Sequence, residues 1–186
     1  MIGEKWRGIP NFEQRETCTI CNRTESMQHI LLECKSNTRK LIWRKARALW
    51  PHGRQHWPQI TLGTIIGIGC ISLADTEVRQ EAEKTRSMEI RGRTRLLQIL
   101  ISEASHLVWV MRCERVIHGK NHTSREITRR WTKKINERLT NDQIITTKIK
   151  RDPKLINLTN ATWKKTLINA NIPHRNWQQH REVFSG

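Results

Sequence analysis

The sequence contains no tyrosine and only two phenylalanines, so an aromatic core must be built mainly from its eight tryptophans. These are spread from Trp6 to Trp177, which indicates that most of the 186 residues pack into one domain or two small ones. Acidic residues are also scarce, because 17 aspartates and glutamates face 34 lysines and arginines, a formal net charge of +17. A chain this basic is expected to bind a polyanion, and nucleic acid is the first candidate.

No segment has the pattern of a secretory signal, and the five cysteines are an odd number. A disulfide framework is therefore not expected, and we predict an intracellular protein of the nucleus or cytoplasm. A long uninterrupted apolar run is missing too. The most apolar stretch, residues 96–118, is interrupted by Glu103, His106, Arg112, Glu114 and Arg115. We predict a buried helix there and no membrane as a partner.

Apolar residues recur at helical spacing in three segments, which predicts a mainly α fold. The first helix should end before Pro51, with an apolar stripe of Ile42, Trp43, Ala46, Leu49 and Trp50. The second covers residues 95–118, and Gly119 would cap its C-terminus. The third begins at Thr123 and Glu126, which have the spacing of a capping box. Its apolar stripe steps by four residues through Ile127, Trp131, Ile135 and Leu139.

Three further regions complete the expected organisation. Residues 57–73 are rich in β-branched residues and glycine and fit either a strand pair or a helix broken by glycine. The polar stretch at about 74–94 fits a solvated linker or an exposed helix. A short last helix around residues 160–169 would place Trp163 and Leu167 together. We divide the chain into three parts. Residues 1–36 are a small cysteine-rich segment, called the knuckle below. Residues 37–140 are a helical region, and residues 141–186 are a basic C-terminal tail.

The basic excess is concentrated in two parts of the chain. Residues 1–34 have a net charge of −1, residues 35–60 have +7 and residues 123–186 have +9. Helical spacing gathers cations on one face in each basic part. We predict phosphate contacts from these faces, made by Arg39, Lys40, Arg44 and Arg47 and by Arg130, Lys134 and Arg138. Trp43 and Trp50 could stack on bases, but their place on an apolar stripe favours a role in the core.

Three cysteines and a histidine form a cluster with the spacing Cys18-x2-Cys21-x7-His29-x4-Cys34. A C-x2-C pair brings two thiolates to one side of a tight turn, and a histidine five residues before the last cysteine can supply the other half of a site. Four protein ligands leave no open position for water, which is typical of structural zinc. We predict one structural Zn²⁺ here. The alternative is ordinary buried cysteines beside a surface histidine.

The segment "KWRGIPNFEQRETCTICNRTESMQHILLEC" resembles the zinc-binding segment near the C-terminus of non-LTR (LINE-type) retrotransposon polyproteins, which follows their reverse transcriptase and often an RNase H domain. The residues that carry the resemblance are Trp6, Arg15, Cys18, Cys21, Glu25, Ser26, His29 and Cys34. The resemblance is specific over residues 6–34. It is looser to about residue 140, where the chain is similar to the helical tail of such proteins in basidiomycete fungi.

The resemblance implies nucleic-acid binding without the catalytic parts of those polyproteins. The chain has no tyrosine and no adjacent aspartate pair, and its three aspartates are Asp75, Asp142 and Asp152. The metal-binding signature of the polymerase and the grouped carboxylates of RNase H are therefore missing. We predict a zinc-dependent nucleic-acid-binding module that is no enzyme and has no small-molecule substrate. The alternatives are a protein-interaction module with an acidic partner and an unrecognised metal-dependent nuclease.

Overall fold

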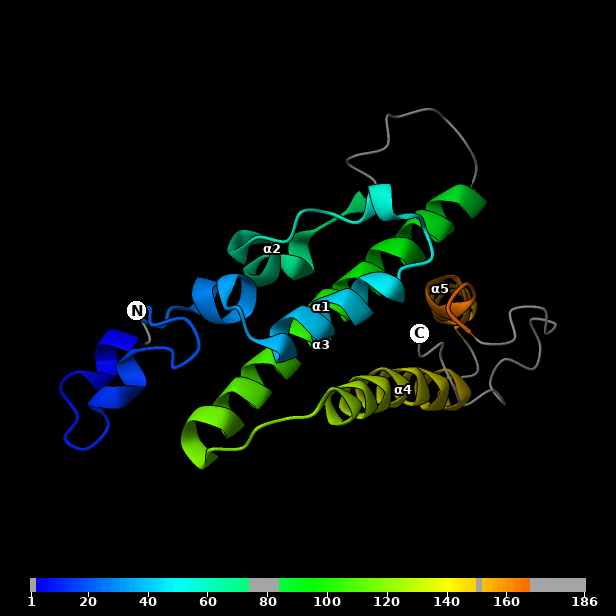
Figure 1. Ribbon diagram of the computed structural model, residues 1–186. Coiled ribbons are helices and arrows are strands. Elements are labelled where there is room, and N and C mark those ends of the chain that lie inside the picture. Colours follow the sequence, from blue (N-terminus) through cyan, green and yellow to red (C-terminus); the bar gives the residue numbers. More distant parts are fainter. Residues whose placement is uncertain (1–2, 74–83, 150–151, 168–186) are drawn as a thin grey trace.

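The computed structural model describes residues 3–73, 84–149 and 152–167, and these are mainly helical, which confirms the predicted fold class (Figure 1). The described residues contain no strand, and an isolated antiparallel bridge joins Thr17 to Thr24. The α-helices are α1 (Asn37–Ala48), α2 (Leu62–Ile66), α3 (Lys84–His118), α4 (Ser124–Lys148) and α5 (Pro153–Trp163). Short 3-10 helices lie at Gly3–Trp6, Glu13–Glu16, Arg54–His56 and Ile68–Cys70, and a π-helix at His29–Glu33.

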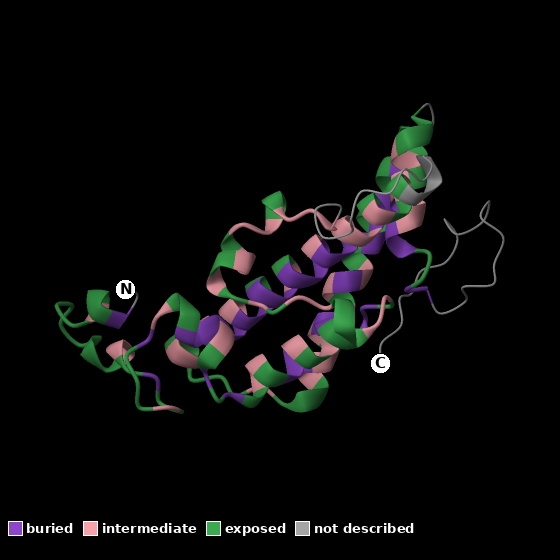
Figure 2. Cartoon of the chain, turned by 90° about the horizontal axis from the view of Figure 1, so that it is seen from above, coloured by how far each residue is buried: buried purple, intermediate pink, exposed green. Residues whose placement is uncertain are grey.

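α3 is the axis of the fold, because α1, α4 and α5 each contact it and α1 also contacts α4. Figure 2 shows the buried residues gathered on the helix faces that meet around α3. The apolar side chains that α3 buries include Leu96, Leu97, Leu100, Ile101, Ala104, Leu107 and Met111. Burial of apolar surface is the largest favourable contribution to the folding free energy of such a bundle.

The segment Ser87–His118 of α3 is long and apolar enough to cross a membrane, with a mean hydropathy of 1.2 in its most apolar window. Inside the protein, however, 61% of that window is buried. A core helix of a soluble protein passes the same test of length and composition, so this segment is weak evidence for a membrane span.

The predicted stripes of α1 and α4 form most of their buried faces. Ile42 and Ala46 of α1 and the four predicted residues of α4 are buried, while Trp43 is only half-buried. The side chain of Thr123 accepts a hydrogen bond from Glu126 N at 3.2 Å, so the threonine caps α4 as predicted. Gly119 follows the last residue of α3 with φ of 63°, the left-handed conformation of a helix C-cap.

α3 begins at Lys84, so the part of the predicted linker region that the structure describes is helical. Tertiary packing supports this first part of α3. A Cβ atom added at the buried Gly92 would lie 2.5 Å from the Cβ of Ala161, so α3 and α5 cross in close contact there. Lys165 also donates to Glu89 at 2.5 Å. Residues 74–83 lie outside the described part of the chain.

The structure decides between the two alternatives for residues 57–73 and places the start of the last helix. Residues 57–73 contain α2 and a 3-10 helix separated by Gly67, which agrees with the glycine-broken helix and not with the strand pair. α5 begins at Pro153, seven residues before the predicted start, because Asp152 caps it and proline suits the first turn. Trp163 and Leu167 are both buried, as predicted. Residues 168–169 of the predicted last helix lie outside the described residues.

Asp142 joins three helices. Its carboxylate accepts two hydrogen bonds from Arg95 of α3, both at 2.7 Å, and one from Trp163 Nε1 of α5 at 2.6 Å. Asp142 is buried and Trp163 is fully buried. Of the three aspartates, Asp142 therefore ties helices together and Asp152 caps one, while Asp75 lies outside the described residues.

Candidate metal centre and basic surfaces

A tight turn presents the first two cysteines. The backbone N–H groups of Cys21 and Asn22 donate to the carbonyl oxygen of Cys18 at 3.3 and 2.8 Å, and Cys18 N donates to Arg23 O at 2.9 Å. Asn22 has φ of 52°, a left-handed conformation that asparagine adopts more readily than most residues. The turn thus places both sulfur atoms on one side of the loop.

A single π-helical turn presents the other two candidate ligands. Ser26 Oγ accepts from His29 N at 3.0 Å, and Cys34 N donates to His29 O at 2.7 Å, a bond between residues five apart. In an α-helix, residues five apart point about 140° away from each other. The wider π turn brings residue i+5 closer to the face of residue i. His29 and Cys34 therefore point toward the same centre. The helical segment that contains this turn starts at Met27.

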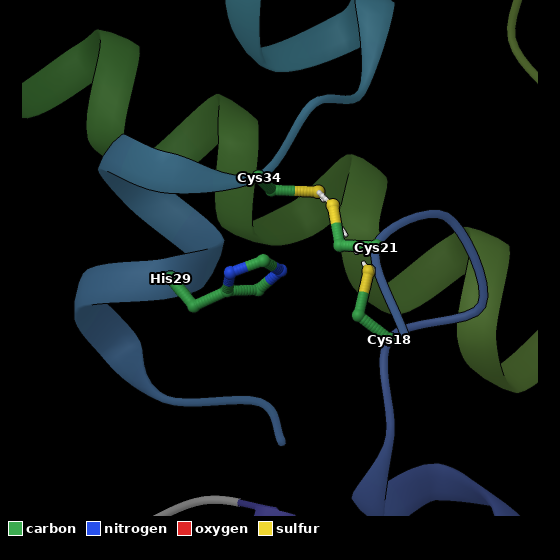
Figure 3. Close-up of side chains that lie close together, drawn as sticks. All are labelled: Cys18, Cys21, His29 and Cys34. Carbon is green, nitrogen blue, oxygen red and sulfur yellow. Dashed lines mark hydrogen bonds between the residues drawn. The ribbon is translucent and has the colours of Figure 1, made fainter. Parts of the chain in front are cut away.

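The four side chains meet in one place (Figure 3). Their ligand atoms all lie within 4.8 Å of one another, and the Cys34 sulfur lies 3.8 Å from the sulfurs of both Cys18 and Cys21. Cys18, His29 and Cys34 are buried, and Cys21 is half-buried. The cluster could hold one metal ion. The surface histidine of the alternative interpretation does not fit, because His29 is only 3% exposed.

The geometry fits a tetrahedral metal ion. With Zn–S bonds of about 2.3 Å, two thiolates of a tetrahedral centre lie about 3.8 Å apart, whereas a disulfide would need about 2.0 Å. His29 Nε2 is buried and has no hydrogen-bond partner among the described residues. Such an orphaned nitrogen is costly unless something binds it, and a metal ion beside the three sulfurs would do so.

Burial and hydrogen bonds shift the pKa values of three of the four side chains. Burial lowers the pKa of His29 below its ordinary value, which favours the neutral imidazole that a metal requires. Burial also raises the pKa of Cys18, so that thiolate needs a nearby cation. The pKa of Cys21 is lowered, although burial alone would raise it. The backbone N–H of Lys35 donates to the Cys21 sulfur at 3.2 Å, and this bond and the hydrogen bonds with the sulfurs of Cys34 and Cys18 outweigh burial.

A buried ion pair fixes the cluster to α3. Glu25 is 1% exposed and binds Arg112 directly, while Arg115 lies 3.9 Å from its other oxygen. Its backbone N–H donates to Glu16 O at 2.9 Å, and its carbonyl accepts from Gly3 N at 2.7 Å. Sequence reasoning did not assign this role to Glu25. The only signal was its place in the acidic-Ser pair that carries the family resemblance.

The predicted basic face of α1 lies on the surface. Lys40, Arg44 and Arg47 are exposed, and none of them forms an ion pair with a described residue. Arg39 is half-buried, and its Nε donates to the carbonyl oxygen of Cys34 at 2.5 Å. This face therefore begins beside the candidate ligand Cys34, and no acidic side chain of the described residues pairs with its exposed cations.

The predicted basic face of α4 is different, because it faces acidic residues of α3. Arg130 makes two hydrogen bonds to Glu114, at 2.6 and 2.8 Å. Arg138 and Lys134 lie 3.4 and 3.9 Å from the carboxylate of Glu103. These ion pairs compensate part of the charge. Contact of this face with nucleic acid stays a prediction.

Comparison with known proteins adds nothing to this geometry. The chain matches no protein-family model, no curated protein and no solved structure. The resemblance to retrotransposon polyproteins therefore stays a prediction, and the site has to be interpreted from its own residues.

Proposed function

We propose that the protein is a zinc-dependent nucleic-acid-binding module, with one structural Zn²⁺ held by Cys18, Cys21, His29 and Cys34. The observation that carries the proposal is the meeting of three sulfurs and one orphaned imidazole nitrogen within 4.8 Å. Thiolates with imidazole select zinc over magnesium or calcium, which prefer oxygen. Because four protein ligands fill a tetrahedron, the ion would supply folding energy and no activated water.

Charge supports the choice of nucleic acid as the partner. The metal centre itself would have a charge of −1, from three thiolates and one Zn²⁺, so attraction must come from elsewhere. The exposed cations of α1, which follow the cluster directly, provide it. The family resemblance agrees, since it places such a module at the end of a nucleic-acid-processing polyprotein that acts inside the cell.

Metal analysis of the purified full-length protein tests the proposal directly. We expect one zinc per chain, retained by Cys70→Ser and lost by Cys34→Ser, since Cys70 is an exposed cysteine outside the cluster. Less than about half an equivalent of zinc in the wild type would contradict it.

Binding to RNA and DNA over a salt series completes the test. Phosphate contacts release counterions, so we expect the logarithm of the affinity to fall steeply with the logarithm of salt concentration. A stronger affinity for an acidic protein surface would favour the interaction module instead. Magnesium-dependent cleavage that is lost when acidic residues are replaced would favour the nuclease.

A further inference from the structure

An open groove of about 600 Å³ lies beside α1 and combines positive charge with indole rings. Four arginines and two tryptophans contribute to its lining: Arg39, Arg44, Arg47, Arg54, Trp43 and Trp57. Among the residues that the structure describes, none of those lining the groove is acidic. Sequence reasoning identified the arginines of α1 but not Arg54 or Trp57, which come from the segment after Pro51.

The two indoles are held in place by contacts outside the groove. Trp43 Nε1 donates to the carbonyl oxygen of Leu31 at 2.8 Å. Trp57 packs edge-on against the buried Trp50, with ring centroids 6.0 Å apart and an interplanar angle of 69°. Both rings are half-buried. Each therefore offers a part of its surface in a fixed orientation, which lowers the entropy cost of binding a flat ligand.

The arginines form a positive rim around these rings. Arg44, Arg47 and Arg54 are exposed, and Arg47 donates to the carbonyl oxygen of Arg54 at 3.5 Å, which links the two walls of the groove. Guanidinium groups bind phosphate oxygens with two parallel hydrogen bonds. The groove thus offers donors for phosphates beside surfaces for flat rings.

We propose that this groove binds a single-stranded segment of nucleic acid, with unpaired bases on Trp43 and Trp57 and phosphates on Arg44, Arg47 and Arg54. The inference rests on the proposed function and names the form of nucleic acid that it requires. In a duplex the faces of the bases are covered by stacking, whereas in a single strand they are free to stack on aromatic side chains. RNA and DNA share both the phosphates and the base faces.

The groove is also joined to the candidate metal centre. The π-helix that carries His29 supplies the Leu31 carbonyl that holds Trp43, and the Cys34 carbonyl holds Arg39. Loss of the metal would therefore disturb one wall of the groove as well as the knuckle.

Tryptophan substitution in the zinc-loaded full-length protein tests the inference. The ligands are a 12-nucleotide oligo(U), the matching oligo(dT) and a duplex of the same length, at one fixed salt concentration. Trp57→Leu should weaken binding of both single strands by about 5- to 150-fold, the range for losing one stacked base, and leave duplex affinity unchanged. Trp6→Leu is the matched control, because Trp6 is half-buried and lies outside the groove.

Two further measurements keep the test decisive. Trp43→Phe keeps an aromatic ring but cannot donate to the Leu31 carbonyl, so it should weaken single-strand binding less than Trp57→Leu does. If circular dichroism shows that Trp57→Leu does not fold, Trp43→Phe replaces it as the test of stacking. Arg54→Gln should reduce the salt slope on single strands by about 0.7 units.

The outcomes separate the two proposals. Single-strand affinity that Trp57→Leu leaves unchanged, or a wild type that prefers duplex, overturns the groove while nucleic-acid binding stands. A wild type that binds polyglutamate more tightly than any of the three oligonucleotides overturns both.

Discussion

Glu25 is a single carboxylate that is buried between two guanidinium groups, and it connects the knuckle to α3. Removing one member of a buried ion pair leaves an uncompensated charge away from water, which costs more than the pair itself contributes. Arg112 would likewise be left as a buried, unpaired charge without Glu25. Its side chain is 8% exposed, and its Nε has no hydrogen-bond partner among the described residues. The two residues are therefore expected to be needed together.

We predict that Glu25→Gln lowers the free energy of unfolding by about 3 kcal/mol, because Arg112 is left buried without a counterion. Urea unfolding of the zinc-loaded protein measures this. Glu137→Gln is the control, since Glu137 pairs with Lys133 on the surface at 3.8 Å and should contribute less than about 1 kcal/mol. Equal effects of the two substitutions would contradict the prediction. The double variant Glu25→Leu with Arg112→Met should recover much of the loss.

α1 has two unlike faces, and both are visible in its contacts. Ile42 and Ala46 are fully buried in the core, while Lys40, Arg44 and Arg47 point away from it. α4 has the same amphipathic pattern in the sequence, yet its cations lie opposite Glu103 and Glu114 of α3. Cations of equal charge on the two helices are thus expected to contribute unequally to binding.

We predict that the triple variant Lys40→Gln, Arg44→Gln, Arg47→Gln reduces the salt slope on single strands by about two units, since each phosphate contact contributes about 0.7. Arg39 is left unchanged because it binds the Cys34 carbonyl. The double variant Lys134→Gln, Arg138→Gln is the comparison, and its slope should change much less because Glu103 already compensates those charges. An unchanged slope in the triple variant would mean that this face is only solvated surface.

The candidate metal centre and the close crossing of α3 with α5 lie at different places along α3. Arg112, near the C-terminal end of α3, binds the knuckle, whereas Gly92 and Arg95 in its first half contact α5 and Asp142. The knuckle lies at one end of the structure and α5 near the other (Figure 1). Metal binding should therefore stabilise the end of the fold at the knuckle more than the end at α5.

We predict that removing the metal with a chelator unfolds residues 15–36 while the middle of α3 stays folded. Apart from Ile30, Leu31 and the candidate ligands, this segment buries little apolar surface, so it depends on the metal for much of its folding energy. Hydrogen exchange measured by mass spectrometry should show fast exchange at 15–36 and continued protection at 96–111, whose residues pack against α1 and α4. Equal protection of 15–36 with and without chelator would contradict this.

Much of this fold could be predicted because the relevant signals are local. The stripes of α1 and α4, the Gly119 cap and the C-x2-C spacing each depend on residues close in sequence. The pairing of Glu25 with Arg112 spans 87 positions, and no local pattern specifies it. The same is true of Trp57, whose orientation depends on Trp50 and a return of the chain after α1. The early start of α5 was local and was missed, since Asp152 before Pro153 is a helix-start signal.

The contact between Gly92 and Ala161 also has a genetic consequence. Any change in either of the first two bases of a glycine codon gives a stop or a residue with a Cβ atom, and here that atom would lie 2.5 Å from the Ala161 carbonyl carbon and from its Cβ. Every such change that gives another residue must therefore shift α3 or α5 at this crossing. Only silent changes at the third base leave this crossing intact. The codon for residue 92 can therefore change only where the encoded residue stays glycine.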